Sequence, residues 1–252
     1  MNKIFTILLV LSLAFSANAA GDAKHPKQLK WSFDGIAGKF DRPSIQRGFQ
    51  VYKEVCAACH SVSKLSFRNL AGAGFSEAEI KALAAGYTIQ DGPNDDGEMF
   101  DRPGLASDKI PSPYPNKKAA QAANGGSYPP DLSLIVKARH DGANYLFSLL
   151  TGYGNTQPKN HEVPEGKYYN PYFPNGNIGM PNPLSADQVT YQDGTKASVE
   201  QMSKDLVNFL QFAAEPEMEE RKQMGLKVIL FLFVFTAFFY VAKCRIWAKL
   251  GQ

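Results

Sequence analysis

Two cysteines separated by two residues, with a histidine directly after the second, constrain this chain more than any other feature: Cys56, Cys59 and His60. Cys-x-x-Cys-His is the spacing at which two thiols bond covalently to the two vinyl groups of one haem, and the adjacent histidine then becomes an iron ligand. A thioredoxin-like redox pair and half of a zinc site are the alternatives. Both fit poorly, because no βαβ pattern surrounds the motif and the only other cysteine, Cys244, lies far along the chain. The motif therefore predicts one covalently bound c-type haem with His60 on the iron.

The first 19 residues have the pattern of a secretory signal peptide. Lys3 precedes an apolar stretch that ends in small residues, Ala17 and Ala19, at the positions where a signal is cleaved. A first transmembrane helix is the alternative, but the apolar run is short for one. We expect residues 1–19 to be removed and the head of the protein to begin at residue 20.

A second apolar segment, residues 224–242, has the length of a transmembrane helix. It is interrupted only by Lys227, and at about 1.5 Å per residue it would reach about 28 Å, close to the thickness of a bilayer core. Its residues are apolar on all sides, which disfavours the alternative of a buried core helix with one apolar stripe. Glutamates precede it and basic residues follow it, so the positive-inside rule places the C-terminus in the cytoplasm. The sequence thus predicts a single-pass protein of the cell inner membrane, with a periplasmic head at 20–223, an anchor at 224–242 and a cytoplasmic tail at 243–252.

The charge of the head differs from that of the whole chain, which has a formal net charge of +3. Five of the 27 basic residues lie in the two terminal segments, whereas all 24 acidic residues lie within 20–223. The head is therefore slightly acidic. This disfavours nucleic acid as a partner and favours a basic protein.

Five carboxylates lie close together in one stretch of the head, with no basic residue between them: Asp91, Asp95, Asp96, Glu98 and Asp101. A calcium loop of the EF-hand type does not fit, because a glycine stands at the position of the first ligand. The run is either a solvated loop or an electrostatic docking surface for a lysine-rich electron acceptor. The residues alone leave both interpretations open.

The pattern of apolar residues predicts a mainly α fold. Steps of three and four residues indicate a helix from about residue 44 into the haem motif and a second near 199–213, and Gly48 would let the two approach closely. We expect further helices at 131–139 and 141–150, each with an aspartate as N-cap. Long segments rich in turn-forming residues, at 91–115 and 151–183, fill the rest of the head, and no strand is predicted with any strength.

The second iron ligand has several candidates. Met180 stands between Gly179 and Pro181 in a stiff turn that would allow the backbone to approach the porphyrin, and a methionine sulfur raises the potential by favouring Fe(II). The alternative is that Met180 only fills a gap in the core. Other methionines and histidines remain rivals: Met99, Met202, Met218, Met224, His25, His140 and His161.

A glycine- and proline-rich segment that begins at Asn124 and runs to residue 132 could wrap the edge of the haem, because prolines pack flat against the ring. Arg139 could then pair with a haem propionate. A plain loop followed by an exposed helix explains the same residues equally well.

Several separate motifs, in this order, resemble the cytochrome c1 family, whose members are the haem subunit of the quinol:cytochrome c oxidoreductase (cytochrome bc1) complex, in its alphaproteobacterial or mitochondrial type. They are RGFQVYKEVCAACH at 47–60, NGG at 124–126, PPDLS at 129–133, KARH at 137–140, YLFSLLTGY at 145–153, IGM at 178–180 and AAEPE at 213–217. The resemblance implies a class I cytochrome c-like haem domain with long loop insertions and one C-terminal transmembrane helix.

The resemblance also implies roles for individual residues and partners. The haem would contact Cys56, Cys59, His60, Met180, Arg139, Tyr145, Pro130 and the segment at Asn124, with His60 and Met180 as the iron ligands. The chain would perform no bond-making chemistry of its own. It would carry electrons from the Rieske iron-sulfur protein to cytochrome c, beside cytochrome b in a dimeric complex. A stand-alone membrane-anchored cytochrome that feeds a terminal oxidase, and an enzyme or gas sensor with an open iron site, are the competing classes.

Overall fold

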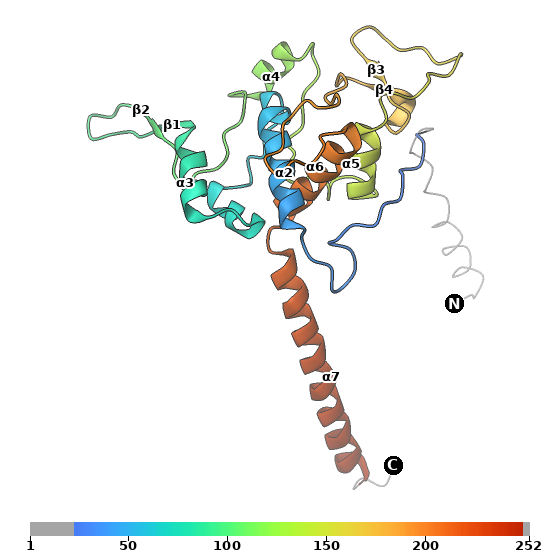
Figure 1. The fold of residues 1–252 in the computed structure, drawn as a ribbon. Coiled ribbons are helices and arrows are strands. Elements are labelled where there is room, and N and C mark those ends of the chain that lie inside the picture. Colours follow the sequence, from blue (N-terminus) through green and yellow to red (C-terminus); the bar gives the residue numbers. More distant parts are fainter. Residues whose placement is uncertain (1–22, 249–252) are drawn as a thin grey trace, which may run out of the picture.

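The computed structural model describes residues 23–248. The predicted signal peptide and the last four residues of the predicted tail lie outside these residues. A head of short helices and long loops stands at one end of a single long helix, α7 (Figure 1). The mainly α fold is confirmed.

Two crossing helices form the centre of the head, as the sequence predicts. The first is α2 (Arg42–Glu54), with Asp41 as N-cap and a proline in its first turn, and the second is α6 (Val199–Ala214), with Ser198 as N-cap. A Cβ placed on Gly48 would lie 2.0 Å from the backbone oxygen of Asp205, so only glycine permits this crossing. Aromatic rings from both helices pack at the contact, among them Phe49, Tyr52 and Phe209.

A buried ion pair ties the same two helices together. Asp205 is fully buried and accepts hydrogen bonds from Ser44 Oγ at 2.7 Å and from Arg47 Nε at 2.9 Å. Arg47 also reaches the more exposed Asp193 at 2.8 Å. A buried carboxylate needs such partners, since an unpaired charge in a core is very costly.

Several smaller elements complete the head: η1 (Cys56–Ala58), η2 (Phe67–Ala73), α3 (Glu77–Ala85), α4 (Lys117–Ala123), α5 (Gly142–Leu150) and η3 (Pro174–Gly176). Of these, α5 is the helix expected at 141–150, and it packs against α6. Its N-cap, Asp141, has a left-handed backbone with φ of 58° and makes no capping bond through its side chain, so the predicted cap is wrong. The helices α3 and α4 were not predicted.

The helix expected at 131–139 is also wrong, because this stretch forms a series of turns. The expected cap, Asp131, accepts a hydrogen bond from Ser133 N, but its carboxylate also binds Ser61 and Ser63, about 70 residues earlier in the chain. These contacts hold the segment against the haem motif in an irregular conformation.

Two small antiparallel sheets lie in or directly beside the turn-rich segments, where we predicted none. Strands β1 (Thr88–Asp91) and β2 (Phe100–Pro103) form a hairpin whose tip carries most of the acidic run. Arg102 closes the base of this hairpin by binding Asp91 and Asp108. Strands β3 (Tyr168–Tyr169) and β4 (Asn177–Ile178) form the second sheet, directly before Met180.

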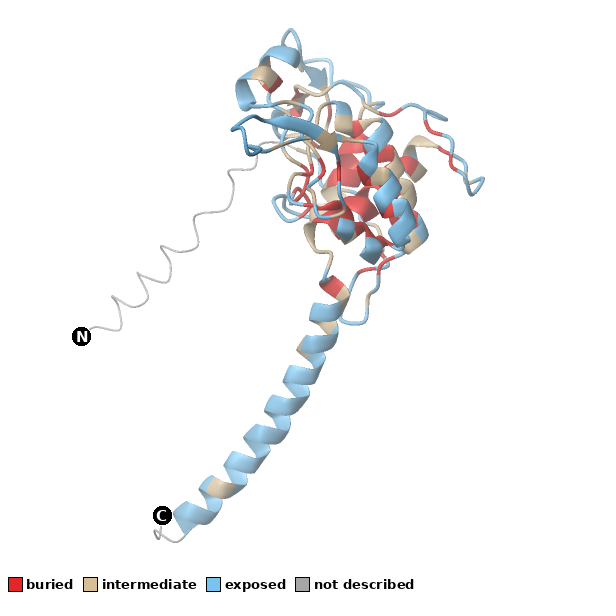
Figure 2. Ribbon diagram, turned by 90° about the vertical axis from the view of Figure 1, so that its left-hand side faces the viewer, coloured by how far each residue is buried: buried red, intermediate tan, exposed pale blue. Residues whose placement is uncertain are grey.

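The long helix α7 (Met218–Ala248) contains the segment predicted to be the anchor but begins six residues earlier. It is exposed along almost its whole length (Figure 2). By length and composition it could cross a membrane, and it is the one such helix among residues 23–248. Side chains of its first turns bind the head: Glu219 pairs with Arg42, and Lys222 donates to the carbonyl oxygens of Phe33 and Gly38.

Candidate haem site

The Cys-x-x-Cys-His motif forms a tight turn at the C-terminal end of α2. The backbone N–H groups of Cys59 and His60 both donate to the carbonyl oxygen of Cys56, at 3.1 and 2.8 Å. Cys56 and Cys59 are free thiols, and burial, with a smaller contribution from Cys59, raises the pKa of Cys56 to about 12. Two unpaired thiols on one short turn are therefore available to bond to a single group.

His60 is held in the orientation and tautomer of a metal ligand. Its Nδ1 lies 2.8 Å from the carbonyl oxygen of Pro130. Because a carbonyl oxygen can only accept, Nδ1 carries the proton and Nε2 keeps its lone pair. Burial lowers the pKa of the imidazole, although the bond to Pro130 and the charge of Asp131 oppose this effect.

Asp131 fastens the segment after Pro130 to the haem motif. Its carboxylate accepts hydrogen bonds from Ser61 Oγ at 2.6 Å and from the backbone N–H groups of Ser63 and Ser133 at 2.9 and 2.8 Å. Burial raises the pKa of this carboxyl group, but the hydrogen bonds from Ser133, Ser61 and Ser63 outweigh it and lower the pKa to about 2. The charged carboxylate thus fixes the position of the Pro130 carbonyl oxygen, and through it the ring of His60.

Met180 lies in a loop that packs against this same segment. A Cβ on Gly179 would lie 2.4 Å from Ser127 Oγ, so the backbone of Gly179 lies directly against the side chain of Ser127. The hydroxyl group of Tyr153, in the turn after α5, donates to the carbonyl oxygen of Met180 at 3.0 Å. Within residues 127–130, Pro130 therefore contacts His60, and Ser127 contacts the loop that carries Met180.

The rival methionines lie elsewhere. Met202 is fully buried on α6, and Met218 is buried at the start of α7. Met99 is 54% exposed on the β1–β2 hairpin, and Met224 is 59% exposed on α7. Among these residues, Met180 is the one that lies beside the segment that binds His60.

The rival histidines are no better placed. The Nε2 atom of His161 is bound to Asn177 Oδ1 at 2.8 Å, and its ring packs on Tyr169. The side chain of His140 is almost fully exposed, and His25 is exposed on the N-terminal segment.

Arg139, Tyr145 and Tyr153 form one group beside the Met180 loop. Tyr145 is half-buried on α5; burial raises its pKa, and the nearby charge of Arg139 lowers it. Burial raises the pKa of Tyr153, and Tyr145 adds to this effect. Arg139 is exposed and donates one hydrogen bond to the carbonyl oxygen of Ala138 at 3.0 Å. Among residues 23–248 it has no carboxylate partner, so its guanidinium group can bind an anion.

Asn124 stands at the C-terminal end of α4, where the wrapping segment begins. Its side-chain N–H group donates to the carbonyl oxygen of Ala120 at 2.7 Å and to Tyr114 Oη at 3.2 Å. The side-chain amide of Asn124 therefore caps the C-terminal end of α4. Ser127 and Tyr153 have no predicted role, and Asp131 was predicted only as a helix cap, although each of the three lies in or beside a motif quoted above.

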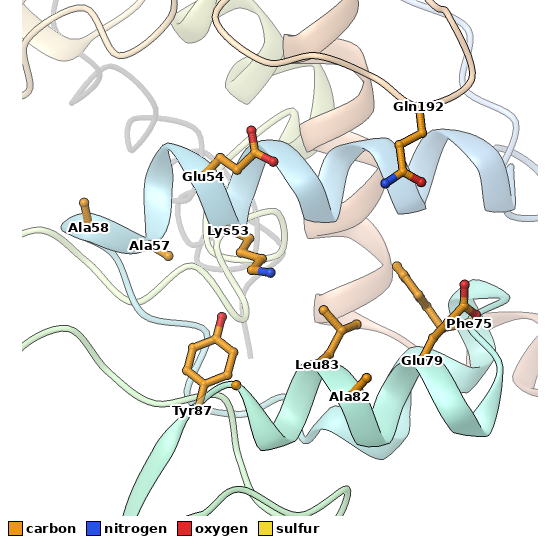
Figure 3. Close-up of a pocket in the computed structure, with 11 residues that line it drawn as sticks. Lys53, Glu54, Ala57, Ala58, Phe75, Glu79, Ala82, Leu83, Tyr87 and Gln192 are labelled. Atoms are coloured by element: carbon orange, nitrogen blue, oxygen red, sulfur yellow. The ribbon is translucent and has the colours of Figure 1, made fainter.

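Two hollows adjoin the motif. One, of about 800 Å³, opens between the end of α2 and α3 and borders Ala57 and Ala58 (Figure 3). The residues that line it include none of the eight predicted haem contacts. The other, of about 240 Å³, is more polar and is bordered by Cys59, Ser61 and Asp131. No group of three or more His, Cys, Asp or Glu side chains in the described part of the chain could hold a bare metal ion, which disfavours the zinc alternative.

This fold and site define a haem-binding cytochrome with a C-terminal helix able to cross a membrane. The model of the Cytochrome C1 family matches residues 31–250. The mitochondrial cytochrome c1 heme protein 1 of Arabidopsis thaliana is 54% identical over 227 residues, 90% of this chain and 74% of that protein. The cytochrome c1 of Rhodospirillum rubrum is 48% identical over 256 residues, 96% of this chain and 93% of that protein. The mitochondrial cytochrome b-c1 complex catalytic subunit of Candida albicans is 51% identical over 219 residues, 87% of this chain and 76% of that protein. The chain belongs to the cytochrome c1 family, whose members are haem proteins of electron transport.

Proposed function

We propose that this chain is the haem-bearing electron-transfer subunit of a membrane-bound cytochrome bc1 complex. It receives electrons from the Rieske iron-sulfur protein and passes them to a cytochrome c, beside cytochrome b in a dimeric assembly. The observation that carries the proposal is the bond between His60 Nδ1 and the Pro130 carbonyl oxygen, because it leaves Nε2 ready for iron next to two free thiols. Family membership supports the remaining steps.

The residues of the site fit one c-type haem. The thiols of Cys56 and Cys59 supply the two covalent bonds, His60 Nε2 supplies one iron ligand and the sulfur of Met180 the other. Tyr145 is half-buried and would exclude water from one side of the haem. The guanidinium group of Arg139, which has no carboxylate partner among the described residues, is suited to a haem propionate. The bound haem supplies reversible one-electron chemistry at its iron, with a potential raised by a methionine ligand.

The β1–β2 hairpin is suited to a basic electron acceptor. Asp95, Asp96 and Glu98 are exposed at its tip, whereas Arg102 is bound to Asp91 and Asp108 at its base. The tip of the hairpin therefore projects negative charge from the head, and no basic side chain lies between these three carboxylates in the sequence. Such a surface steers a lysine-rich cytochrome c and accelerates its encounter with the head.

The topology follows from the two ends of the chain. The N-terminal signal exports the head to the periplasm, α7 anchors it in the cell inner membrane, and the basic residues after the apolar segment hold the C-terminus in the cytoplasm. This places the haem motif in the compartment of soluble electron carriers.

A mass measurement on the denatured chain tests the central chemistry. Each thiol adds across one vinyl group without loss of atoms, so the purified chain should weigh one intact haem more than the processed polypeptide. Cys59→Ser should leave at most one thioether bond, and the double variant with Cys56→Ser should carry no haem after denaturation. Cys244→Ser is the matched control and should keep the full mass. A wild-type chain that loses its haem on denaturation would contradict the proposal.

A further inference from the structure

The loop at residues 32–39 is built as a rigid projection beside α7. Its base is closed by the N–H group of Lys39, which donates to the carbonyl oxygen of Ser32 at 2.9 Å. The phenylalanines within and beside this base, Phe33 and Phe40, are both buried; Phe33 stacks on Trp31 and Phe40 packs on Phe212. The two ends of the loop are therefore part of the core, and its tip is not.

The tip is tightly turned and exposes an apolar side chain. Gly35 has a φ of +70°, and a Cβ on Gly38 would lie 2.1 Å from the carbonyl oxygen of Asp34, so both positions require glycine. Ile36, between them, is 81% exposed, more than any other large apolar side chain of the described residues. A single exposed isoleucine is ordinary on a soluble surface. What distinguishes Ile36 is where the loop lies.

Three contacts fix the loop to the first turns of α7. Lys222 Nζ donates to the carbonyl oxygen of Phe33 at 2.6 Å and to that of Gly38 at 3.3 Å. Glu219 accepts from the N–H group of Phe40 at 2.7 Å while it pairs with Arg42. Glu219 lies about 8 Å along the helix axis from the first residue of the apolar segment, at about 1.5 Å per residue. The loop, dark blue in Figure 1, accordingly lies beside the first turns of α7.

We propose that the 32–39 loop is a second membrane contact, in which Ile36 enters the interfacial layer of the bilayer. The inference rests on the proposed role of α7 as the membrane anchor. Lys39 is exposed at the end of the loop and would extend its charged group into the lipid headgroup region, as long basic side chains do at a membrane interface. A helix alone leaves the head free to tilt, whereas a helix and a rigid loop fix its orientation above the membrane. A fixed orientation keeps the electron-transfer distances to membrane-bound partners constant.

Spin labels on the full-length, haem-loaded chain in phosphatidylcholine and phosphatidylglycerol nanodiscs test this contact. The labels are placed by Ile36→Cys, Phe233→Cys and Asp95→Cys, one at a time in a Cys244→Ser background. Phe233 lies within the apolar part of α7, and Asp95 lies at the tip of the β1–β2 hairpin. The readout is the ratio of collisions with oxygen, which partitions into the bilayer, to collisions with a water-soluble nickel chelate.

The ratio at position 36 should lie between those at 233 and 95, and several-fold above the ratio at 95. Equal ratios at 36 and 95 would overturn the proposal, and so would a label at 36 shielded from both reagents, since that is the signature of a covering protein. A low ratio at 233 would instead refute the anchor itself, so the two failures are distinguishable.

A second variant tests the contacts that hold the loop. Lys222→Met removes the two hydrogen bonds to Phe33 and Gly38 and keeps most of the length of the side chain. The label at position 36 should then become more mobile, and its ratio should fall towards that at position 95. An unchanged spectrum and ratio would mean that Lys222 does not position the loop.

Discussion

Replacing Gly48 by alanine tests whether the crossing of α2 and α6 holds the head together. The new Cβ would lie 2.0 Å from the backbone oxygen and 2.5 Å from the backbone carbon of Asp205, and 2.8 Å from the Cβ of Phe209. None of these atoms is the end of a flexible side chain, so the helices must separate. Overpacking of a core typically costs about 1–3 kcal/mol. Separation of the helices would also weaken the hydrogen bonds that Ser44 and Arg47 donate to buried Asp205. Each hydrogen bond to this carboxylate that is lost would cost about 1–3 kcal/mol.

Alanine is intrinsically better than glycine inside a helix by about 1 kcal/mol, which offsets part of this cost. We therefore expect Gly48→Ala to lower the free energy of unfolding by about 3 kcal/mol. The assay is denaturant unfolding of the full chain in detergent, followed by circular dichroism and by tryptophan fluorescence.

Gly154→Ala is the control, because its Cβ would meet nothing within 4 Å among the described residues and should change stability by about 0.5 kcal/mol or less. A Gly48→Ala chain as stable as the control, or more stable, would refute the close crossing.

Three further predictions concern the site and its surroundings. Met180→Leu should lower the haem potential and let the reduced protein bind carbon monoxide, since a thioether ligand that favours Fe(II) is lost; an unchanged potentiometric titration would count against Met180 as a ligand. Neutralising Asp95, Asp96 and Glu98 together should slow cytochrome c reduction at low salt but not at high salt, whereas equal slowing at both would indicate a structural effect. Asp131→Asn should lower the free energy of unfolding by about 1–3 kcal/mol, because one oxygen cannot replace the acceptors of a carboxylate. Because folding lowers the pKa of this carboxyl group to about 2, the difference should be full above about pH 4 and shrink as the pH falls towards 2; a difference that stays constant between pH 5 and pH 2 would mean that folding does not lower the pKa.

The elements that the sequence predicts well are those with local signals. Apolar residues at helical spacing and good N-caps mark α2 and α6, and Gly48 indicates where they cross. A local signal for α3 was also present and was overlooked. Ser76 and Glu79 form a capping box, in which each side chain binds the backbone of the other residue.

The parts that the sequence does not predict depend on distant contacts. Asp131 looks like a helix cap, but Ser61 and Ser63 take its carboxylate, and the following residues form turns. The bond from His60 to the Pro130 carbonyl oxygen also joins residues 70 positions apart. Nothing in the local pattern indicates such pairs, because the two partners lie about 70 positions apart in the chain. In addition, a backbone carbonyl or N–H group is the same in every residue and gives no signal of its own.

The site shows the same division. The Cys-x-x-Cys-His spacing is local and predicts a haem motif by itself. The support for Met180 comes from Ser127 and Tyr153, which meet its loop only in the folded chain. The long helix α7 was predicted by its composition, whereas its early start, with Met218 buried in the head, follows from packing.

The most direct test of the account is the difference spectrum of the complex that this chain forms. The chain is tagged, membranes are solubilised gently, and the reduced-minus-oxidised visible spectrum of the purified material is recorded. We predict the signals of both b-type and c-type haem, together with quinol-driven reduction of cytochrome c. A c-type spectrum alone, without b-type haem or quinol-dependent activity, would contradict the proposed place of this chain in a cytochrome bc1 complex and would indicate a stand-alone carrier.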